Sequence, residues 1–335
     1  MKEIEKYNYD LVKKDIENLY IIYKDLLKEK KCDILIMGWF QYLILICIEA
    51  LNYAKLNKTL KYKKIIENCR ARMKPLKIDY NLMYQKMKKL NSDKMIEYKE
   101  YVERHVRILV SNWITNYGVY KINDKIIGNT FLYESLYKKI IYENGSINVN
   151  KILNVSKEIG ETVSDLINYF ELEKKYIGIS KNIEIKCADY NVFKNNNKLL
   201  RANIDTNKGL ILLNSISLIN FYNFVISKMN VRKELKYRLG YIVYDNTHEN
   251  ISKAIGEEKI IYEKLKKFKC LNKKEFRNCM FHYNLENDLE DEEIKEEMYF
   301  GIIYKYLNIS EKEYIDLIDE YMNEISYTLE KYILK

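Results

Sequence analysis

A short run near the C-terminal end carries the residue types best suited to chemistry on a phosphate. Arg277 and His282 are separated by four residues, and Asn278 follows the arginine directly. A guanidinium binds phosphate oxygens through a planar fork of donors, and an imidazole can take and give a proton near neutral pH. Together they suit cleavage of a phosphodiester whose own 2′-hydroxyl is the nucleophile. This chemistry indicates RNA as the substrate.

The segment around these residues predicts a helix from Lys273 to Leu285 with two distinct faces. At about 100° per residue, one face is apolar. Its members are Phe276, Cys279, Met280 and Tyr283. Arg277, Asn278 and His282 fall on the other side, so His282 does not follow the pattern of a core histidine.

The same helical spacing predicts how the site is assembled. Arg277 and His282 would diverge by about 140° around one helix, so one helix could not easily direct both at one phosphorus. A two-fold seam would place His282 of each subunit beside Arg277 of the other. We therefore expect a homodimer, with Phe281 and Leu285 lining the contact.

At Arg277, Asn278 and His282 the chain resembles the HEPN superfamily, helical nucleases and toxins with the signature Arg-x4–6-His, often Arg-Asn-x3-His. The resemblance implies a dimerising helical bundle with a composite, metal-independent ribonuclease site. It implies that Arg277 holds the scissile phosphate, His282 acts as acid and base, and Asn278 orients them. One subgroup is modified on a Tyr two residues after the His. Here Asn284 occupies that position and Tyr283 precedes it, so the chain departs from that pattern.

A second polar cluster lies on an earlier helix that otherwise looks buried. Asp245, Asn246 and His248 are candidates to support the Arg–His pair or contact RNA, and Tyr283 is a further candidate. HEPN bundles commonly present a polar residue from an earlier helix in this way. A helix end exposed to solvent would explain the cluster nearly as well.

Composition predicts an all-α fold. Hydrophobic residues make up 47% and charged residues 31% of the 335 positions, which are typical of globular proteins. The chain has only one Pro and ten Gly, the residues that most often form turns, and this favours helices. The six Cys have no close CxxC pairing and no companion His cluster, so they predict neither a zinc site nor disulfides. We expect no metal and no cofactor.

The chain is expected to be cytoplasmic and to have no membrane partner. Its start lacks the apolar stretch of a signal peptide. The apolar run Ile34–Ile48 has fifteen residues, fewer than the roughly 20 needed to span a bilayer, and predicts a buried helix. The net charge of +9 is spread along the chain and permits RNA binding without indicating it.

Four segments are expected along the chain. Residues 1–125 predict a helical domain, in which Arg104, His105 and Arg107 read as a surface basic patch. Residues 126–190 resemble a winged helix, with a break at Gly160 and a small wing near Asn182–Cys187, but acidic residues on the reading helix favour a packing role. Residues 191–208 predict a polar linker, and 209–335 a HEPN-like helical bundle.

The final helix of that bundle has a clear start signal. Ser310 and Glu313 predict a capping box at its beginning. The helix then carries an apolar stripe that predicts core packing.

These patterns favour a metal-independent endoribonuclease that acts as a toxin or phage-defence effector. We expect RNA as substrate and an antitoxin or sensor as a further partner. The alternative is a helical scaffold or regulator that binds nucleic acid or protein without cutting.

Overall fold

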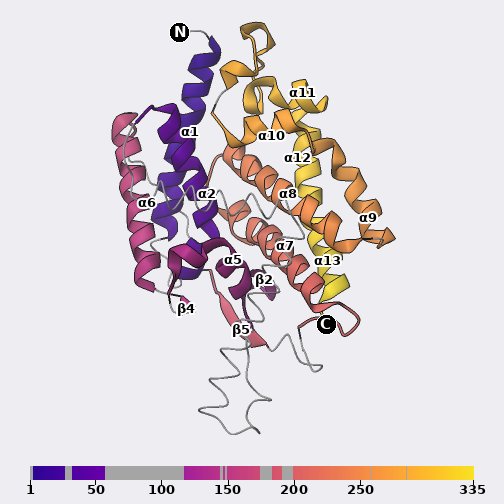
Figure 1. The fold of residues 1–335 in the computed structure, drawn as a ribbon. Coiled ribbons are helices and arrows are strands. Elements are labelled where there is room, and N and C mark those ends of the chain that lie inside the picture. Colours follow the sequence, from indigo (N-terminus) through magenta and orange to yellow (C-terminus); the bar gives the residue numbers. More distant parts are fainter. Residues whose placement is uncertain are drawn as a thin grey trace.

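The computed structural model describes residues 3–26, 32–56, 117–143, 146–147, 149–173, 183–190, 199–256, 258–283 and 285–335. Most of these residues are helical, which confirms the predicted all-α class (Figure 1). The predicted basic patch at Arg104, His105 and Arg107 and residues 191–198 of the predicted polar linker lie outside the described residues.

Three long helices pack together on one side of the molecule. They are α1 (Glu3–Leu26), α2 (Cys32–Tyr53) and α6 (Val149–Tyr169). α1 is amphipathic, whereas α2 is apolar on nearly every side because it runs through the interior. By length and composition alone, Ile34–Tyr53 and Lys208–Lys228 could each cross a membrane. Their apolar windows are 94% and 89% buried inside the chain, the burial expected of core helices.

A small antiparallel sheet lies at one end of these helices. Its strand order is β2-β1-β5, with β1 at Tyr117–Ile122, β2 at Lys125–Asn129 and β5 at Lys186–Tyr190. The two-residue turn Asn123–Asp124 has positive φ at both positions, as a right-twisted hairpin requires. α5 (Thr130–Ile141) follows β2, and the short strands β3 (Tyr142–Glu143) and β4 (Ser146–Ile147) connect it to α6.

The middle segment therefore differs from a winged helix. Its described part holds two helices, α5 and α6, and α6 continues through Gly160 without a break. A Cβ at Gly160 would lie 2.5 Å from the Tyr23 hydroxyl, so this glycine allows α1 and α6 to approach closely. The predicted wing residues near Cys187 pair instead with β1, outside the segment.

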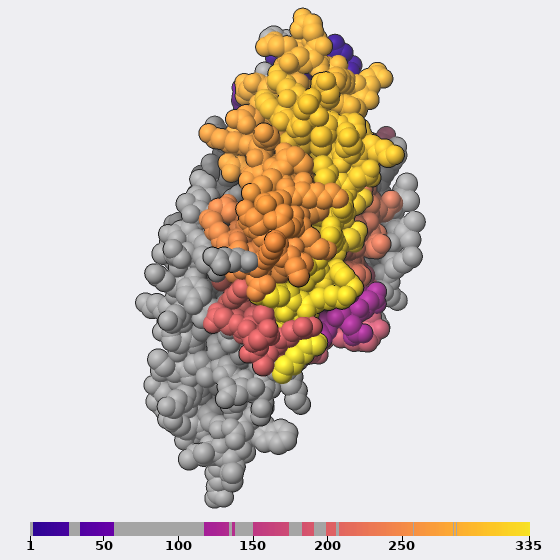
Figure 2. All heavy atoms as spheres, turned by 90° about the vertical axis from the view of Figure 1, so that its right-hand side faces the viewer, coloured from indigo at the N-terminus to yellow at the C-terminus, as the bar shows by residue number. Residues whose placement is uncertain are grey.

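The C-terminal half is almost entirely helical. Its longer elements are α7 (Thr206–Phe224), α8 (Lys233–Ile255), α9 (Lys259–Lys266), α10 (Lys274–Phe281), α11 (Ile302–Leu307), α12 (Glu311–Glu320) and α13 (Ser326–Ile333). Short 3₁₀ turns join them: η2 (Ile226–Lys228), η3 (Lys267–Leu271), η4 (Leu285–Asn287), η5 (Asp291–Glu293) and η6 (Met298–Gly301). Figure 2 looks onto the face that carries α9 and α10 in orange and the last helices in yellow.

The start of the last helical stretch confirms the predicted capping box. The Ser310 hydroxyl accepts from the Glu313 N–H at 3.2 Å, and the Glu313 carboxylate accepts from the Ser310 N–H at 2.7 Å. A π-helical turn, η7 (Tyr321–Ile325), joins α12 to α13. The Met322 carbonyl in this turn accepts a hydrogen bond of 3.0 Å from the Asn223 amide.

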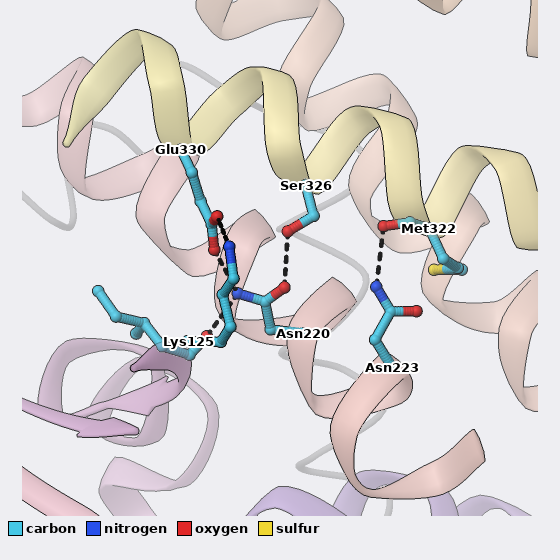
Figure 3. A network of polar contacts seen from close by, with 7 residues as sticks. Lys125, Asn220, Asn223, Met322, Ser326 and Glu330 are labelled. Atoms are coloured by element: carbon cyan, nitrogen blue, oxygen red, sulfur yellow. Dashed lines mark hydrogen bonds and ion pairs between the residues drawn. The ribbon is translucent and has the colours of Figure 1, made fainter. Parts of the chain in front are cut away.

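A polar network ties the sheet to the last helix through α7 (Figure 3). The Asn220 amide donates to the Ile126 carbonyl at 3.1 Å and to Glu330 at 2.9 Å, and its oxygen accepts from Ser326 at 2.6 Å. Lys125 completes the network as an ion pair with Glu330. Every polar group of Asn220 thus has a partner, as a buried amide requires.

The buried apolar side chains of the described residues form one cluster that runs from Ile4 to Ile333. Hydrogen bonds also cross the predicted boundaries. Tyr137 donates to the Met37 carbonyl at 2.9 Å, and Asn129 donates to Ser217 at 2.9 Å. The predicted segments therefore share a core.

Candidate functional site

The Arg–His run lies on α10 and at its end, but the helix is shorter than predicted. Phe276, Cys279 and Met280 are buried, as the periodicity predicts. The helix ends at Phe281, and His282 is its C-cap with extended backbone angles of φ −128° and ψ 156°. His282 still donates its N–H to the Asn278 carbonyl at 3.0 Å, but the helix predicted to run to Leu285 ends four residues earlier.

The His282 ring is held by a buried carboxylate. Its Nδ1 lies 2.9 Å from Oε2 of Glu49, a residue of α2 that is distant in sequence. The Glu49 side chain is 6% exposed and the His282 side chain 34% exposed. A carboxylate accepts from Nδ1–H, so this contact favours the tautomer whose lone pair is on Nε2. In this tautomer Nε2 can accept a proton.

The arginine and asparagine of the run are half-buried on α10. Within the described part of the chain, the Arg277 guanidinium forms neither an ion pair nor a hydrogen bond. Burial raises the pKa of Tyr241, and the positive charge of Arg277 opposes that rise, which places this charge near the α8–α10 contact. A guanidinium without an internal carboxylate partner is available to an external anion.

Tyr283 does not face solvent. Its hydroxyl donates to Asp15 of α1 at 2.6 Å, and its carbonyl accepts from the Asn8 amide at 3.2 Å. Burial raises the pKa of Tyr283 well above its usual value, so the hydroxyl stays protonated and can donate. With 5% of its surface exposed, Tyr283 is an anchor beside His282 and not a contact for RNA.

Arg238 of α8 completes this buried cluster. It forms an ion pair with Asp15, donates from Nε to the Met280 carbonyl at 2.7 Å, and lies 4.5 Å from the Tyr283 ring centre. Arg238 and Asp15 are 2% and 1% exposed. Charges so deeply buried require partners, and the pair thereby joins α1, α8 and the end of α10. We call Asp15, Arg238 and Tyr283 the buried triad.

The polar cluster predicted on α8 lies at another place. His248 is 6% exposed, contacts the Leu265 carbonyl of α9 through Nε2 at 3.2 Å, and has its pKa lowered by burial. α8 meets α10 at Arg238 and Tyr241 instead, and His248 is seven residues, about 10 Å, further along. Asp245 is buried and Asn246 half-buried on the same helix. The structure thus does not bring His248 to the end of α10.

Sequence reasoning missed Glu49, Asp15 and Arg238. A signal exists for Asp15, since it shares the buried face of α1 with Val12, Ile16 and Leu19. A charge at such a position requires a buried partner. No signal within one segment pairs it with Arg238, which is 223 residues away.

Among the residues that the structure describes, no group of three or more His, Cys, Asp or Glu side chains could hold a metal ion. No family model, curated protein or solved structure matches the chain.

Proposed function

We propose that the chain is a metal-independent endoribonuclease whose site is the end of α10. The observation that supports this most is the His282–Glu49 contact of 2.9 Å. A partly exposed imidazole held by a buried carboxylate is the arrangement of a positioned general base. It lies at the end of the short helix that carries Arg277, whose charge no described carboxylate neutralises.

In the proposed reaction, His282 accepts the proton of a ribose 2′-hydroxyl at Nε2. The 2′-oxygen attacks the adjacent phosphorus, and the bond to the 5′-oxygen of the next nucleotide breaks as the protonated His282 imidazole gives the proton to that oxygen. The products are a 2′,3′-cyclic phosphate and a 5′-hydroxyl. Arg277 stabilises the charge that develops on the phosphoryl oxygens, and Asn278 orients Arg277 and His282. Glu49 holds the His282 ring in the required tautomer.

An RNase of this kind harms the cell that makes it unless it is restrained. We therefore place the activity in a toxin or phage-defence effector that is controlled by an antitoxin or sensor partner.

The test is incubation of the purified protein with total RNA in excess EDTA. We expect cleavage without added metal, with 2′,3′-cyclic phosphate ends detected by mass spectrometry. Arg277→Ala and His282→Ala should each lower the rate at least 10²-fold, the lower range for a positioned acid or base. Arg232→Ala is a matched control, because Arg232 is half-exposed and makes only a surface ion pair with Glu17.

Two results would contradict the proposal. Cleavage that stops in EDTA and returns with Mg²⁺ or Mn²⁺ would overturn the metal-free mechanism. RNA binding without any cleavage would instead support the alternative, a helical scaffold that holds nucleic acid. Circular dichroism of each variant distinguishes lost chemistry from lost folding.

A further inference from the structure

Positive charge is concentrated in the segment that leads into the candidate site. Residues 259–277 hold eight Lys or Arg and two Glu, a net charge of 8 − 2 = +6, while the whole chain carries +9. The basic residues are Lys259, Lys264, Lys266, Lys267, Lys269, Lys273, Lys274 and Arg277. The segment comprises α9, η3 and the first half of α10, and α9 lies on the face shown in Figure 2.

Only part of this charge is neutralised inside the molecule. Three of the lysines form ion pairs: Lys264 with Glu324, Lys266 with Glu263 and Lys267 with Glu320. Lys259, Lys269, Lys273 and Lys274 are exposed and have no ion pair within the described part of the chain. Three of these four, Lys269, Lys273 and Lys274, lie between Tyr262 and Arg277 along the chain. This arrangement differs from the mixed charges of an ordinary solvated face.

An exposed aromatic ring lies within the same segment. Tyr262 is 37% exposed, and the ammonium groups of Lys266 and Lys269 lie 5.0 Å and 5.5 Å from its ring centre. Ile260 beside it is 74% exposed. A tyrosine ring flanked by lysines can stack on an unpaired base while the lysines contact the neighbouring phosphates.

The segment is held firmly on α8. The hydroxyls of Tyr244 and Tyr241 donate to the carbonyls of Phe268 at 2.7 Å and Leu271 at 3.1 Å. Further along, the Arg277 N–H donates to the carbonyl of Lys273, the N-cap of α10, at 2.9 Å, so these two residues lie one helical turn apart. The unpaired charges therefore form a track from Tyr262 through Lys269 and Lys273 to Arg277.

The chain that follows α10 has the opposite charge. Residues 286–297 carry eight Asp or Glu and one Lys. A polyanion is attracted to the segment before Arg277 and repelled by the segment after His282. Because the charge of the chain changes from positive to negative at the end of α10, an RNA strand is expected to bind along the segment before Arg277 and not along the segment after His282.

We infer that Tyr262, Lys269, Lys273 and Lys274 form a binding track for single-stranded RNA that leads a strand to Arg277 and His282. The inference rests on the proposed function for its choice of RNA. A single strand fits better than a duplex, because bases in a duplex are already stacked and cannot cover Tyr262. The lysines contact phosphates without reading sequence, so the track binds RNA with little base preference.

Binding can be measured apart from cleavage with a fluorescent 2′-O-methyl RNA, which has no nucleophilic hydroxyl. We expect the full chain to bind this single strand with an affinity that falls as salt rises. Lys269→Gln/Lys273→Gln/Lys274→Gln should reduce the slope of log K against log salt by about 2, since each phosphate contact contributes about 0.7. Tyr262→Ala should weaken binding about tenfold, and Tyr262→Phe should keep the wild-type affinity.

Lys6→Gln/Lys186→Gln/Lys312→Gln is the matched control. These lysines are exposed, make no ion pair with a described residue and lie on other elements, and their replacement removes the same charge. The control should keep the wild-type slope. Equal losses in both triple variants would mean that binding depends on overall charge alone and would overturn the inference. Tighter binding of duplex RNA or of anionic lipid vesicles at the same lysines would also overturn it.

The inference and the proposed function can fail separately. If wild-type protein binds the strand through the track but cuts no RNA, the track stands and the nuclease proposal fails. If wild-type protein cuts RNA while the Lys269/Lys273/Lys274 variant binds and cuts as well as wild type, the nuclease stands and the track fails.

Discussion

The ring of His282 is held in its orientation and tautomer by Glu49, a residue 233 positions earlier in the chain. Replacing a carboxylate with an amide at this place changes little volume but allows the imidazole to reverse its tautomer. The amide NH₂ can donate to Nδ1, and the proton then lies on Nε2, where the base is needed. In the proposed site Glu49 positions His282, and this contribution to the rate can be measured separately from the contribution of Glu49 to packing.

We predict that Glu49→Gln lowers the rate of RNA cleavage at least about 10²-fold through kcat, with little change in KM. Nitrogen NMR of the His282 ring should show a shift from the tautomer protonated on Nδ1 to that protonated on Nε2. Glu17→Gln, at a carboxylate that is 38% exposed, should leave both readouts unchanged. A Glu49→Gln protein with wild-type kcat and tautomer would remove Glu49 from the site.

A second prediction concerns how stability depends on pH and rests on His248. Burial lowers the pKa of His248 from the ordinary value of 6.5. The unfolded chain therefore binds a proton at a higher pH than the folded chain does. The free energy of unfolding should fall as pH drops through about 6.5, down to the lower pKa of the folded state. His248→Phe keeps a ring against Tyr244 and Tyr321 and removes the titration. Urea unfolding at pH 7 and pH 5 should therefore show a smaller difference in the variant than in the wild type.

At the scale of elements, α10 is fixed by side chains beyond its own end. The chain leaves the helix at His282 so that Tyr283 can reach Asp15 of α1, and Arg238 of α8 holds both groups. Nothing within the segment 273–285 signals this ending, which is why the periodicity predicted a longer helix. The position of His282 thus depends on α1 and α8.

We predict that Asp15→Asn destabilises the protein by about 3–5 kcal/mol, because Arg238 then loses its buried counter-charge. Asp15→Leu/Arg238→Met, which removes both charges, should cost less than the single change. Urea unfolding monitored by circular dichroism gives both values. An exposed pair such as Glu17 with Arg232 is the comparison, and Glu17→Ala should cost at most about 1 kcal/mol. If Asp15→Asn and Glu17→Ala lowered the free energy of unfolding equally, burial would not determine the contribution of an ion pair to stability.

Features that depend on residues close together in the sequence could be predicted from it, whereas contacts between distant residues could not. The Ser310–Glu313 capping box, the buried apolar helix and the apolar face of α10 each depend on residues a few positions apart. The extended segment at Cys187 pairs with β1, some 65 residues earlier, and no local pattern fixes that register. The sequence predicts a helix break at Gly160. The structure shows instead that a glycine is needed there because Tyr23 of α1 packs against it, a contact between residues far apart in sequence. The candidate site divides in the same way: its Arg and His are visible in the sequence, and its Glu49 is not.

At the scale of the whole molecule, residues from both halves of the chain contribute to the proposed site. α2 contributes Glu49 and α1 contributes Asp15, while α10 carries Arg277 and precedes His282. The N-terminal helices are therefore part of the proposed catalytic unit as well as the proposed surface for a sensor or antitoxin. A partner that shifts α1 or α2 would displace the carboxylate that holds His282. This provides a physical route for control of the proposed nuclease.

Assembly into a homodimer remains a prediction, with its contact revised by the structure. Leu285 is 2% exposed and cannot line an interface, whereas Phe281 is half-buried at the end of α10. The Arg277 guanidinium forms no ion pair in the described part of its own chain, and in the predicted dimer it would bind a phosphate that His282 of the second copy contacts. We predict a particle of twice the 40.5 kDa chain mass by light scattering.

Mixing inactive variants tests whether that dimer forms the site. If Arg277 of one copy acts with His282 of the other, refolding Arg277→Ala with His282→Ala should restore about a quarter of the wild-type rate. Half of the dimers are then mixed, and each mixed dimer keeps one intact pair of residues. No recovery is expected if both residues of a site come from one chain, or if both histidines must act together. A monomer that cuts RNA at the full rate at high dilution would exclude a site shared between subunits.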